Sequence, residues 1–233
     1  MQHTQGMLRF TPILLALLYG VIMYRFSVWR TNRELASQSN ELVDPQLGAL
    51  TNRMADALEL EKIRVHLYEI DPVNGLAAPD GKIYITRGFY RKFTDGEVTA
   101  AELASVVAHE LGHVALGHSR RRMIDFSGQN ALRTALAMIL SRFIPGIGGW
   151  IANFLTTMLA ARLSRGDEYE ADEYAAALLI KSGIGTVPQI SLLSKLEALT
   201  KTGHGAAPAW LMSHPKTPDR IAAIEKIEAD WRK

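Results

Sequence analysis

Apolar and polar residues repeat with two different periods along the chain, and the period predicts the elements. In "LGALTNRMADALEL", residues 47–60, apolar positions recur every three or four residues, which is typical of an amphipathic helix. "KIRVHLYEI", residues 62–70, and "KIYITRG", residues 82–88, alternate with a period of two and predict two strands. "TDGE", residues 94–97, has the form of a capping box, so we predict that a helix starts there and runs through His118.

The N-terminus carries an apolar run long enough for a membrane anchor. "FTPILLALLYGVIMY", residues 10–24, has no charged side chain, and with Arg25 snorkelling the run extends to Trp29. About 20 apolar residues suffice for one transmembrane helix. A cleaved signal peptide is the alternative, but the run ends in Tyr24, Arg25 and Phe26 instead of small residues. We therefore predict a single-pass anchor that binds membrane lipid, and arginines on both flanks leave open the side of the membrane on which the C-terminal domain lies.

This pattern predicts a membrane anchor with its flanks at 1–30, a linker at 31–45 and one domain at 46–233. Within that domain, 143–161 is a second uncharged stretch, which Pro145 and three nearby glycines interrupt. We expect residues 131–163 to form an apolar helical hairpin that touches the membrane and covers whatever functional site this domain carries.

Composition narrows the candidate chemistry. The chain has 233 residues, of which 48% are hydrophobic, enough for one good core. The net charge of +2 comes from nearly balanced acids and bases and gives no reason to expect nucleic acid as a partner. Because there are no cysteines, any metal ion must be held by histidine, aspartate or glutamate.

"SVVAHELGHVALGHSR", residues 105–120, contains the strongest chemical motif. On a helix, His109 and His113 lie one turn apart on the same face, and Glu110 can act on a water beside the metal. This spacing predicts a catalytic zinc site. His118 is five residues beyond His113, about 140° around an ideal helix, so we expect a helix-end histidine without a role in the site. Ser119 stands where a metzincin needs its third histidine, which excludes that class.

A third ligand is expected in "SRGDEYEADEYAAALL", residues 164–179. Glu168 and Asp172 are four residues apart and share a helix face, so one can bind zinc while the other orients a histidine ligand. For Glu170 and Glu173 we expect only a favourable interaction with the amino end of the helix.

Four segments in this order resemble the HtpX-like zinc metalloendopeptidases, which include type I CAAX prenyl proteases: "APDGKIYITRG", "ELASVVAHELGHVALGH", "SRGDEYEADEYA" and "SHPKTPDRI". The resemblance implies a gluzincin fold, one zinc ion per chain and localisation in a bacterial-type inner membrane. It also implies that Glu168 is the zinc ligand and Asp172 orients a histidine. Together with the periodicity, it leads us to expect a mainly α (α+β) domain with a small antiparallel sheet.

The resemblance further implies active-site roles for His214 and Arg220, as donors to an oxyanion or, for His214, as a cap on the zinc. Residues 76–78 resemble the family's edge strand, where an extended substrate adds by β-augmentation. We therefore expect hydrolysis of internal peptide bonds in unfolded membrane or envelope proteins. A zinc-containing chaperone or binding module is the alternative, against which Glu110 argues because a structural metal site needs no general base.

Overall fold

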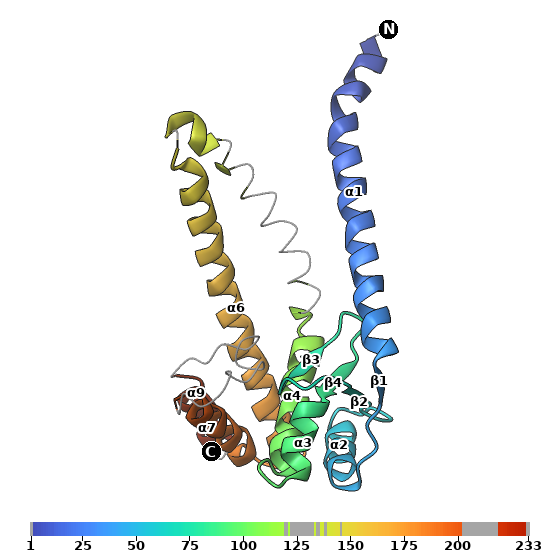
Figure 1. The fold of residues 1–233 in the computed structure, drawn as a ribbon, viewed down its shortest axis with the longest axis vertical. Coiled ribbons are helices and arrows are strands. Elements are labelled where there is room, and N and C mark those ends of the chain that lie inside the picture. Colours follow the sequence, from blue (N-terminus) through green and yellow to red (C-terminus); the bar gives the residue numbers. More distant parts are fainter. Residues whose placement is uncertain are drawn as a thin grey trace. The chain divides into compact units, whose positions relative to one another are not determined.

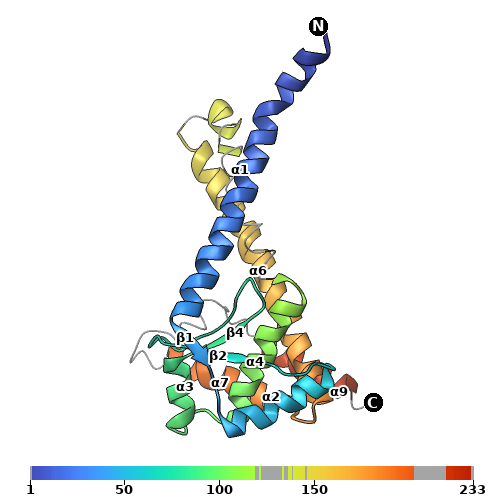
Figure 2. The same cartoon turned by 90° about the vertical axis from the view of Figure 1, so that its right-hand side faces the viewer.

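The computed structural model describes residues 2–118, 121, 133, 136–137, 139–144, 146–201 and 219–231 (Figures 1 and 2). Contacts divide the chain into two compact units, one with residues 1–37 and 120–156, the other with residues 38–119 and 157–233. Each unit is described by itself.

The first unit contains the N-terminal helix α1 (Gln2–Ser37) and the first turns of α6 (Gly148–Lys181). Large apolar side chains of α1, such as Tyr19, Phe26 and Trp29, are exposed. The predicted helix over 10–29 is thus confirmed as a helix. In the described part of the chain, no helix combines the length and the apolar character needed to cross a membrane. Of the predicted hairpin, the helical part after Gly148 is present, and much of 119–138 lies outside the described residues.

The second unit contains a four-stranded sheet, in the order β1-β2-β4-β3. Its strands are β1 (Ser39–Glu41), β2 (Val65–Tyr68), β3 (Gly75–Ala77) and β4 (Ile83–Thr86). β1 runs antiparallel to β2 and β3 antiparallel to β4, but β2 and β4 are parallel, with Val65 opposite Ile83. The sheet is therefore mixed, and the prediction of an antiparallel sheet was wrong.

The short strand β3 explains this difference. β3 lies between β2 and β4 in the sequence, and a tight turn at Gly81 joins it to β4 as an antiparallel hairpin. The chain therefore reverses its direction twice between β2 and β4, once before β3 and once after it. β4 therefore enters the sheet parallel to β2. The segment 31–45, predicted as a linker, contains the end of α1 and all of β1, which pairs with β2.

The described helices of the second unit are α2 (Pro45–Ala57), α3 (Arg87–Thr94), α4 (Ala100–Ala115), the later turns of α6, α7 (Val187–Lys201) and α9 (Asp219–Trp231). The helix α4 begins later than predicted. Its capping box is Thr99 with Glu102, because α3 occupies the chain up to Thr94 and Gly96 turns the backbone with φ 79°. The sequence pattern did not predict α3.

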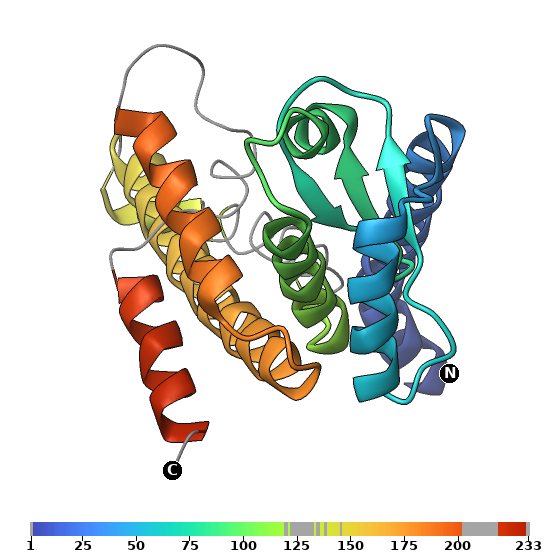
Figure 3. The same ribbon diagram turned by 90° about the horizontal axis from the view of Figure 1, so that it is seen from below.

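The helix α4 lies at the centre of this unit (Figure 3), with α2 on one side and α7 on the other. Its side chains from Glu102 to Glu110 are all buried, and β3 also contacts it. The main hydrophobic cluster surrounds it, with Met54 from α2, Ile85 from β4, Leu179 from α6 and Leu193 from α7. The polar residues of the "HELGH" motif therefore lie in the core, where a buried polar group must find a partner or bind an ion.

Candidate metal centre

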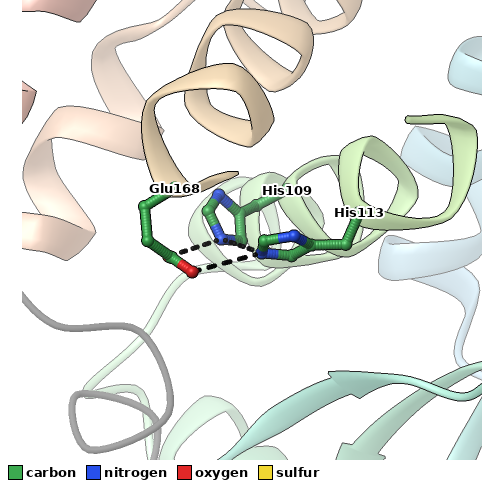
Figure 4. Close-up of side chains that lie close together, drawn as sticks. All are labelled: His109, His113 and Glu168. Carbon is green, nitrogen blue, oxygen red and sulfur yellow. Dashed lines mark hydrogen bonds and ion pairs between the residues drawn. The ribbon is translucent and has the colours of Figure 1, made fainter. Parts of the chain in front are cut away.

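Two helices bring three ligand groups together at the carboxyl end of α4. His109 and His113 project from α4 and Glu168 projects from α6, and Figure 4 shows their polar atoms converging. The two Nε2 atoms are 3.1 Å apart. Glu168 Oε2 is 3.4 Å from His109 Nε2, and Glu168 Oε1 is 3.6 Å from His113 Nε2. All three side chains are buried.

These separations fit a tetrahedral metal ion. With zinc bonds of about 2.0–2.1 Å, neighbouring ligand atoms lie about 3.3 Å apart. The three measured separations, 3.1, 3.4 and 3.6 Å, surround this value. Two imidazoles and one carboxylate form a donor set that zinc accepts in catalytic sites, with the fourth position left for water or substrate. The residues present therefore fit the metal ion that the motif predicts.

A close approach of two helices makes this convergence possible. A Cβ atom added to Gly112 would lie 3.0 Å from both the Cα and the carbonyl oxygen of Ala171 on α6. Ala171 is itself small and buried. Because neither residue carries a large side chain, α6 comes near enough for Glu168 to reach the two histidines.

Asp172 and Arg220 hold His109 in place. His109 Nδ1 donates to Asp172 Oδ1 at 3.0 Å, so its Nε2 is left for the metal. Arg220, on α9, grips the same carboxylate with two donors, Nε to Oδ2 at 2.5 Å and Nη2 to Oδ1 at 2.8 Å. Burial alone would raise the pKa of Asp172, but the hydrogen bonds from Arg220 and His109 outweigh it and lower this pKa. Asp172 is therefore an ionised acceptor.

The same surroundings affect His109. Burial alone would lower its pKa, yet the hydrogen bonds to Asp172 and Glu168 outweigh burial and raise the pKa to about 9. The cluster thus holds a positive charge at this point at neutral pH, carried by the imidazolium in the metal-free protein.

Glu110 lies beside the edge of the sheet. Its carboxylate is buried, and Oε1 lies 3.6 Å from the place where a Cβ on Gly75 of β3 would stand. β3 is the last strand in the sheet order of the described residues; of the predicted edge-strand residues 76–78, Leu76 and Ala77 belong to it and Ala78 follows it. The Glu110 carboxylate, which the motif predicts as the general base, and β3 are therefore neighbours.

His118 differs from its prediction. It is fully buried, and its Nδ1 lies 2.9 Å from His113 Nδ1. The estimate of 140° assumed an unbroken helix, but α4 ends at Ala115 and Gly117 adopts φ 69°, which turns the chain. A glycine two residues after the last helical residue was the available signal for this turn.

Glu170 also differs from its prediction. Because α6 starts at Gly148, residues 164–179 lie in its later turns, and the acids do not mark its amino end. Glu170 Oε2 instead accepts a hydrogen bond from His118 Nε2 at 2.9 Å. Glu173 is exposed.

Arg220 and His214 were predicted as active-site groups. The guanidinium of Arg220 donates to Asp172 through Nε and Nη2, and its Nη1 lies 3.7 Å from Glu168 Oε2, so Arg220 contacts the ligand cluster. Its role as a donor to an oxyanion stays a prediction. His214 lies outside the described residues, and its role stays a prediction.

Comparison with known proteins identifies the family of this chain. The model of peptidase family M48 matches residues 41–228. The metalloprotease LoiP of Escherichia coli is 29% identical over 191 residues, which cover 79% of this chain and 71% of LoiP. A protease HtpX homolog of Salinibacter ruber is 26% identical, covering 92% of this chain and 88% of the relative. The mitochondrial metalloendopeptidase OMA1 of Bos taurus is 25% identical over 70% of this chain, but only 32% of OMA1 is covered.

The chain belongs to peptidase family M48 and is a metalloendopeptidase. This confirms the family and the enzyme class that the sequence motifs predicted.

Proposed function

We propose that this member of peptidase family M48 is a zinc-dependent endopeptidase whose metal is held by His109, His113 and Glu168, with one zinc ion per chain. The observation that supports this most is the convergence of these three ligand groups beside a buried carboxylate, Glu110, and an edge strand.

Zinc bound at this place would polarise a substrate carbonyl and lower the pKa of a water molecule to near neutrality. Glu110 follows His109 directly in the motif, so it shares the site without being one of the three converging groups. Its carboxylate is suited to take the proton of the attacking water and later to deliver it to the leaving amine. Asp172, fixed by Arg220, keeps the Nδ1 proton of His109 in place throughout.

We infer that the substrate binds as an extended segment along β3. β3 is the last strand in the sheet order of the described residues and lies beside Glu110, where an extended segment can align with it. A strand added there would pass Glu110. Binding through main-chain hydrogen bonds tolerates many sequences but requires an unfolded segment. Unfolded polypeptides, such as damaged membrane or envelope proteins, are therefore the substrates that we propose.

Membrane association is part of the same proposal. On α1, the side chains of Leu18, Tyr19 and Ile22 are more than half exposed, although all are apolar or aromatic. At the start of α6, the rings of Trp150 and Phe154 are exposed and stack with their centroids 5.7 Å apart. Exposed apolar surface of this kind is typical of contact with lipid or another apolar partner.

A peptide blocked at both ends tests the proposed reaction. The purified protein should cleave an acetylated and amidated unstructured peptide at internal bonds, lose this activity in a chelator and regain it with zinc. Mass spectrometry of the products identifies the cleaved bonds. Cleavage that survives complete metal removal, or a zinc-loaded protein that binds unfolded peptide without cutting it, would contradict the proposal.

A test of the membrane proposal is co-sedimentation of the full chain with lipid vesicles, compared with a chain that starts at Gln38. We expect most of the full chain in the vesicle fraction and clearly less of the shortened one. Equal partition of both would exclude a role for α1 in membrane binding.

A further inference from the structure

Among the residues that the structure describes, His118 is the one buried histidine that the three-residue ligand set does not use. No part of its surface is exposed, and its two ring nitrogens have different neighbours. Nδ1 lies 2.9 Å from His113 Nδ1, and Nε2 lies 2.9 Å from Glu170 Oε2. Asp167 is also near, with Oδ1 4.0 Å from Nε2.

The position of His113 decides which nitrogen carries which proton. Its Nε2 faces His109 Nε2 at 3.1 Å and Glu168 Oε1 at 3.6 Å, so this nitrogen must supply the lone pair that binds the metal. A neutral imidazole then carries its single proton on Nδ1. The atom in line to accept that proton is His118 Nδ1, so His118 must carry its own proton on Nε2. From there it donates to Glu170, and every hydrogen bond in the chain has one donor and one acceptor.

A second metal site is the competing interpretation. Ligand atoms of His118, Asp167 and Glu170 lie within 4.8 Å of one another, which is close enough to hold an ion. A metal on His118 Nε2 would leave its proton on Nδ1, facing His113. The proton of His113 would then have to sit on Nε2, where it blocks the first site. With neutral imidazoles the two sites exclude each other, and Glu170, whose side chain is 55% exposed, is a poor anchor for a buried ion.

We propose, on the basis of the zinc site proposed above, that His118 is a positioning residue for His113. It accepts a hydrogen bond from His113 Nδ1, which fixes the orientation and tautomer of that ring, and it donates a hydrogen bond from its own Nε2 to Glu170. Each histidine ligand then has its own orienting partner. His109 donates a hydrogen bond to Asp172, which a buried arginine holds. His113 donates to a second histidine, which in turn donates to an exposed carboxylate.

Metal affinity of matched variants tests the proposal without depending on catalysis. In His118→Asn the side-chain oxygen can stand where Nδ1 stood and accept the same proton, whereas His118→Leu fills the space without an acceptor. Loss of such an orienting partner typically costs 10–100-fold in metal affinity. In competition with a chromophoric chelator, we expect His118→Leu to bind zinc about 10–100-fold more weakly, and His118→Asn to recover most of this loss.

Exposed positions on α6 supply a second comparison that does not depend on replacing a buried group. Glu170→Ala removes the outer acceptor and should weaken zinc binding a few-fold, while Glu173→Ala, the same change on the same helix, should not. Equal zinc affinity in wild type and His118→Leu, or equal losses in His118→Leu and His118→Asn, would overturn the proposal. A lower melting temperature of the metal-free variant with unchanged zinc affinity would show a merely structural histidine.

The tautomers can be observed directly in the zinc-loaded wild type. Long-range proton–nitrogen spectra of ¹⁵N-histidine protein should show His113 protonated on Nδ1 and His118 on Nε2. A proton on His118 Nδ1, or a second equivalent of tightly bound zinc that disappears in His118→Leu, would replace our assignment by the second metal site. A wild type that binds no zinc at all would refute the proposed function itself, whereas unchanged binding in the variants refutes only this inference.

Discussion

The two ends of α4 bury charge in opposite ways. Near its amino end the Glu102 carboxylate accepts from Thr99 N at 2.8 Å, Ser191 Oγ at 2.6 Å and Lys195 Nζ at 2.8 Å. These partners come from the cap of α4 and from α7, and they satisfy the carboxylate within the chain. At the carboxyl end, by contrast, two imidazole nitrogens face each other at 3.1 Å beside a buried glutamate.

This difference separates a fold contact from a functional site. The Glu102 cluster is closed, since each donor has an acceptor, and it ties α4 to α7. The carboxyl end directs two imidazole nitrogens and a carboxylate at one point, an arrangement that needs a positive charge there, from a metal ion or, in the metal-free protein, from the proton on His109. Buried charge alone therefore does not mark a site; the direction in which the polar atoms point does.

The largest effect is expected from neutralising one glutamate at each end of α4. Glu110→Gln should lower turnover about 10²–10⁴-fold, the usual loss when a general base is removed, without lowering zinc content or melting temperature. Glu102→Gln should lower the melting temperature and leave turnover per folded molecule unchanged. Steady-state kinetics on metal-replete samples, with zinc quantified in each, make the measurement. Near-normal turnover of Glu110→Gln would mean that another group is the base.

The next largest effect concerns the cation of each cluster. Arg220→Met leaves Asp172 buried without its main partner, and such losses cost about 3–5 kcal/mol. Lys195→Met removes the cation from Glu102, but the lysine side chain is 43% exposed, so we expect about 1 kcal/mol or less. Urea unfolding of the metal-free variants provides both values. If the two substitutions cost the same, the distinction between a buried and a partly solvated pair is wrong.

Local spacing explains which parts of the site could be predicted. His109, Glu110 and His113 lie within one helical turn, and Glu168 and Asp172 share a face of α6 although the start of that helix was placed too late. Helical geometry over four residues does not depend on where the helix begins.

The failures have in common that they depend on distant or unusual backbone. Arg220 reaches Asp172 across 48 residues of sequence, which no local pattern reveals. His118 turns inward because Gly117 adopts a positive φ. β4 runs parallel to β2 because the chain forms the three-residue strand β3 between them. Each of these features needs tertiary contacts to define it.

A smaller effect is expected from the spacing between α4 and α6. Gly112→Ala places a Cβ 3.0 Å from the backbone of Ala171, so the helices must separate by a few tenths of an ångström. Glu168 would then sit farther from His109 and His113, and we expect zinc affinity to fall about tenfold, within the range for disturbed orientation of a ligand. Gly48→Ala, on α2, meets nothing within 4 Å and is the control. Unchanged zinc affinity in Gly112→Ala would show that this approach is not needed.

The smallest expected effect is in how the stability of the fold depends on pH, and it comes from Glu102 at the amino end of α4. Burial alone would raise the pKa of Glu102, but hydrogen bonds from Lys195, Ser191 and Thr99 outweigh it and hold this pKa below its usual value. Because the folded-state pKa is below the unfolded value of about 4.3, Glu102 stabilises the fold fully above that pH. The contribution declines as the pH falls through the folded-state pKa.

The metal-free protein should therefore lose stability below about pH 4 more steeply than Glu102→Gln, whose amide does not titrate in this range. Urea midpoints of both proteins between about pH 3 and pH 6 provide the measurement, and working without metal keeps zinc release out of the comparison. At pH 6 the wild type should be the more stable of the two, because the ionised carboxylate binds Lys195 and the amide does not. The two curves should converge as Glu102 becomes protonated. Parallel curves over the whole range would mean that folding does not lower the pKa of Glu102. The contrast between the two ends of α4 would then lose its electrostatic basis.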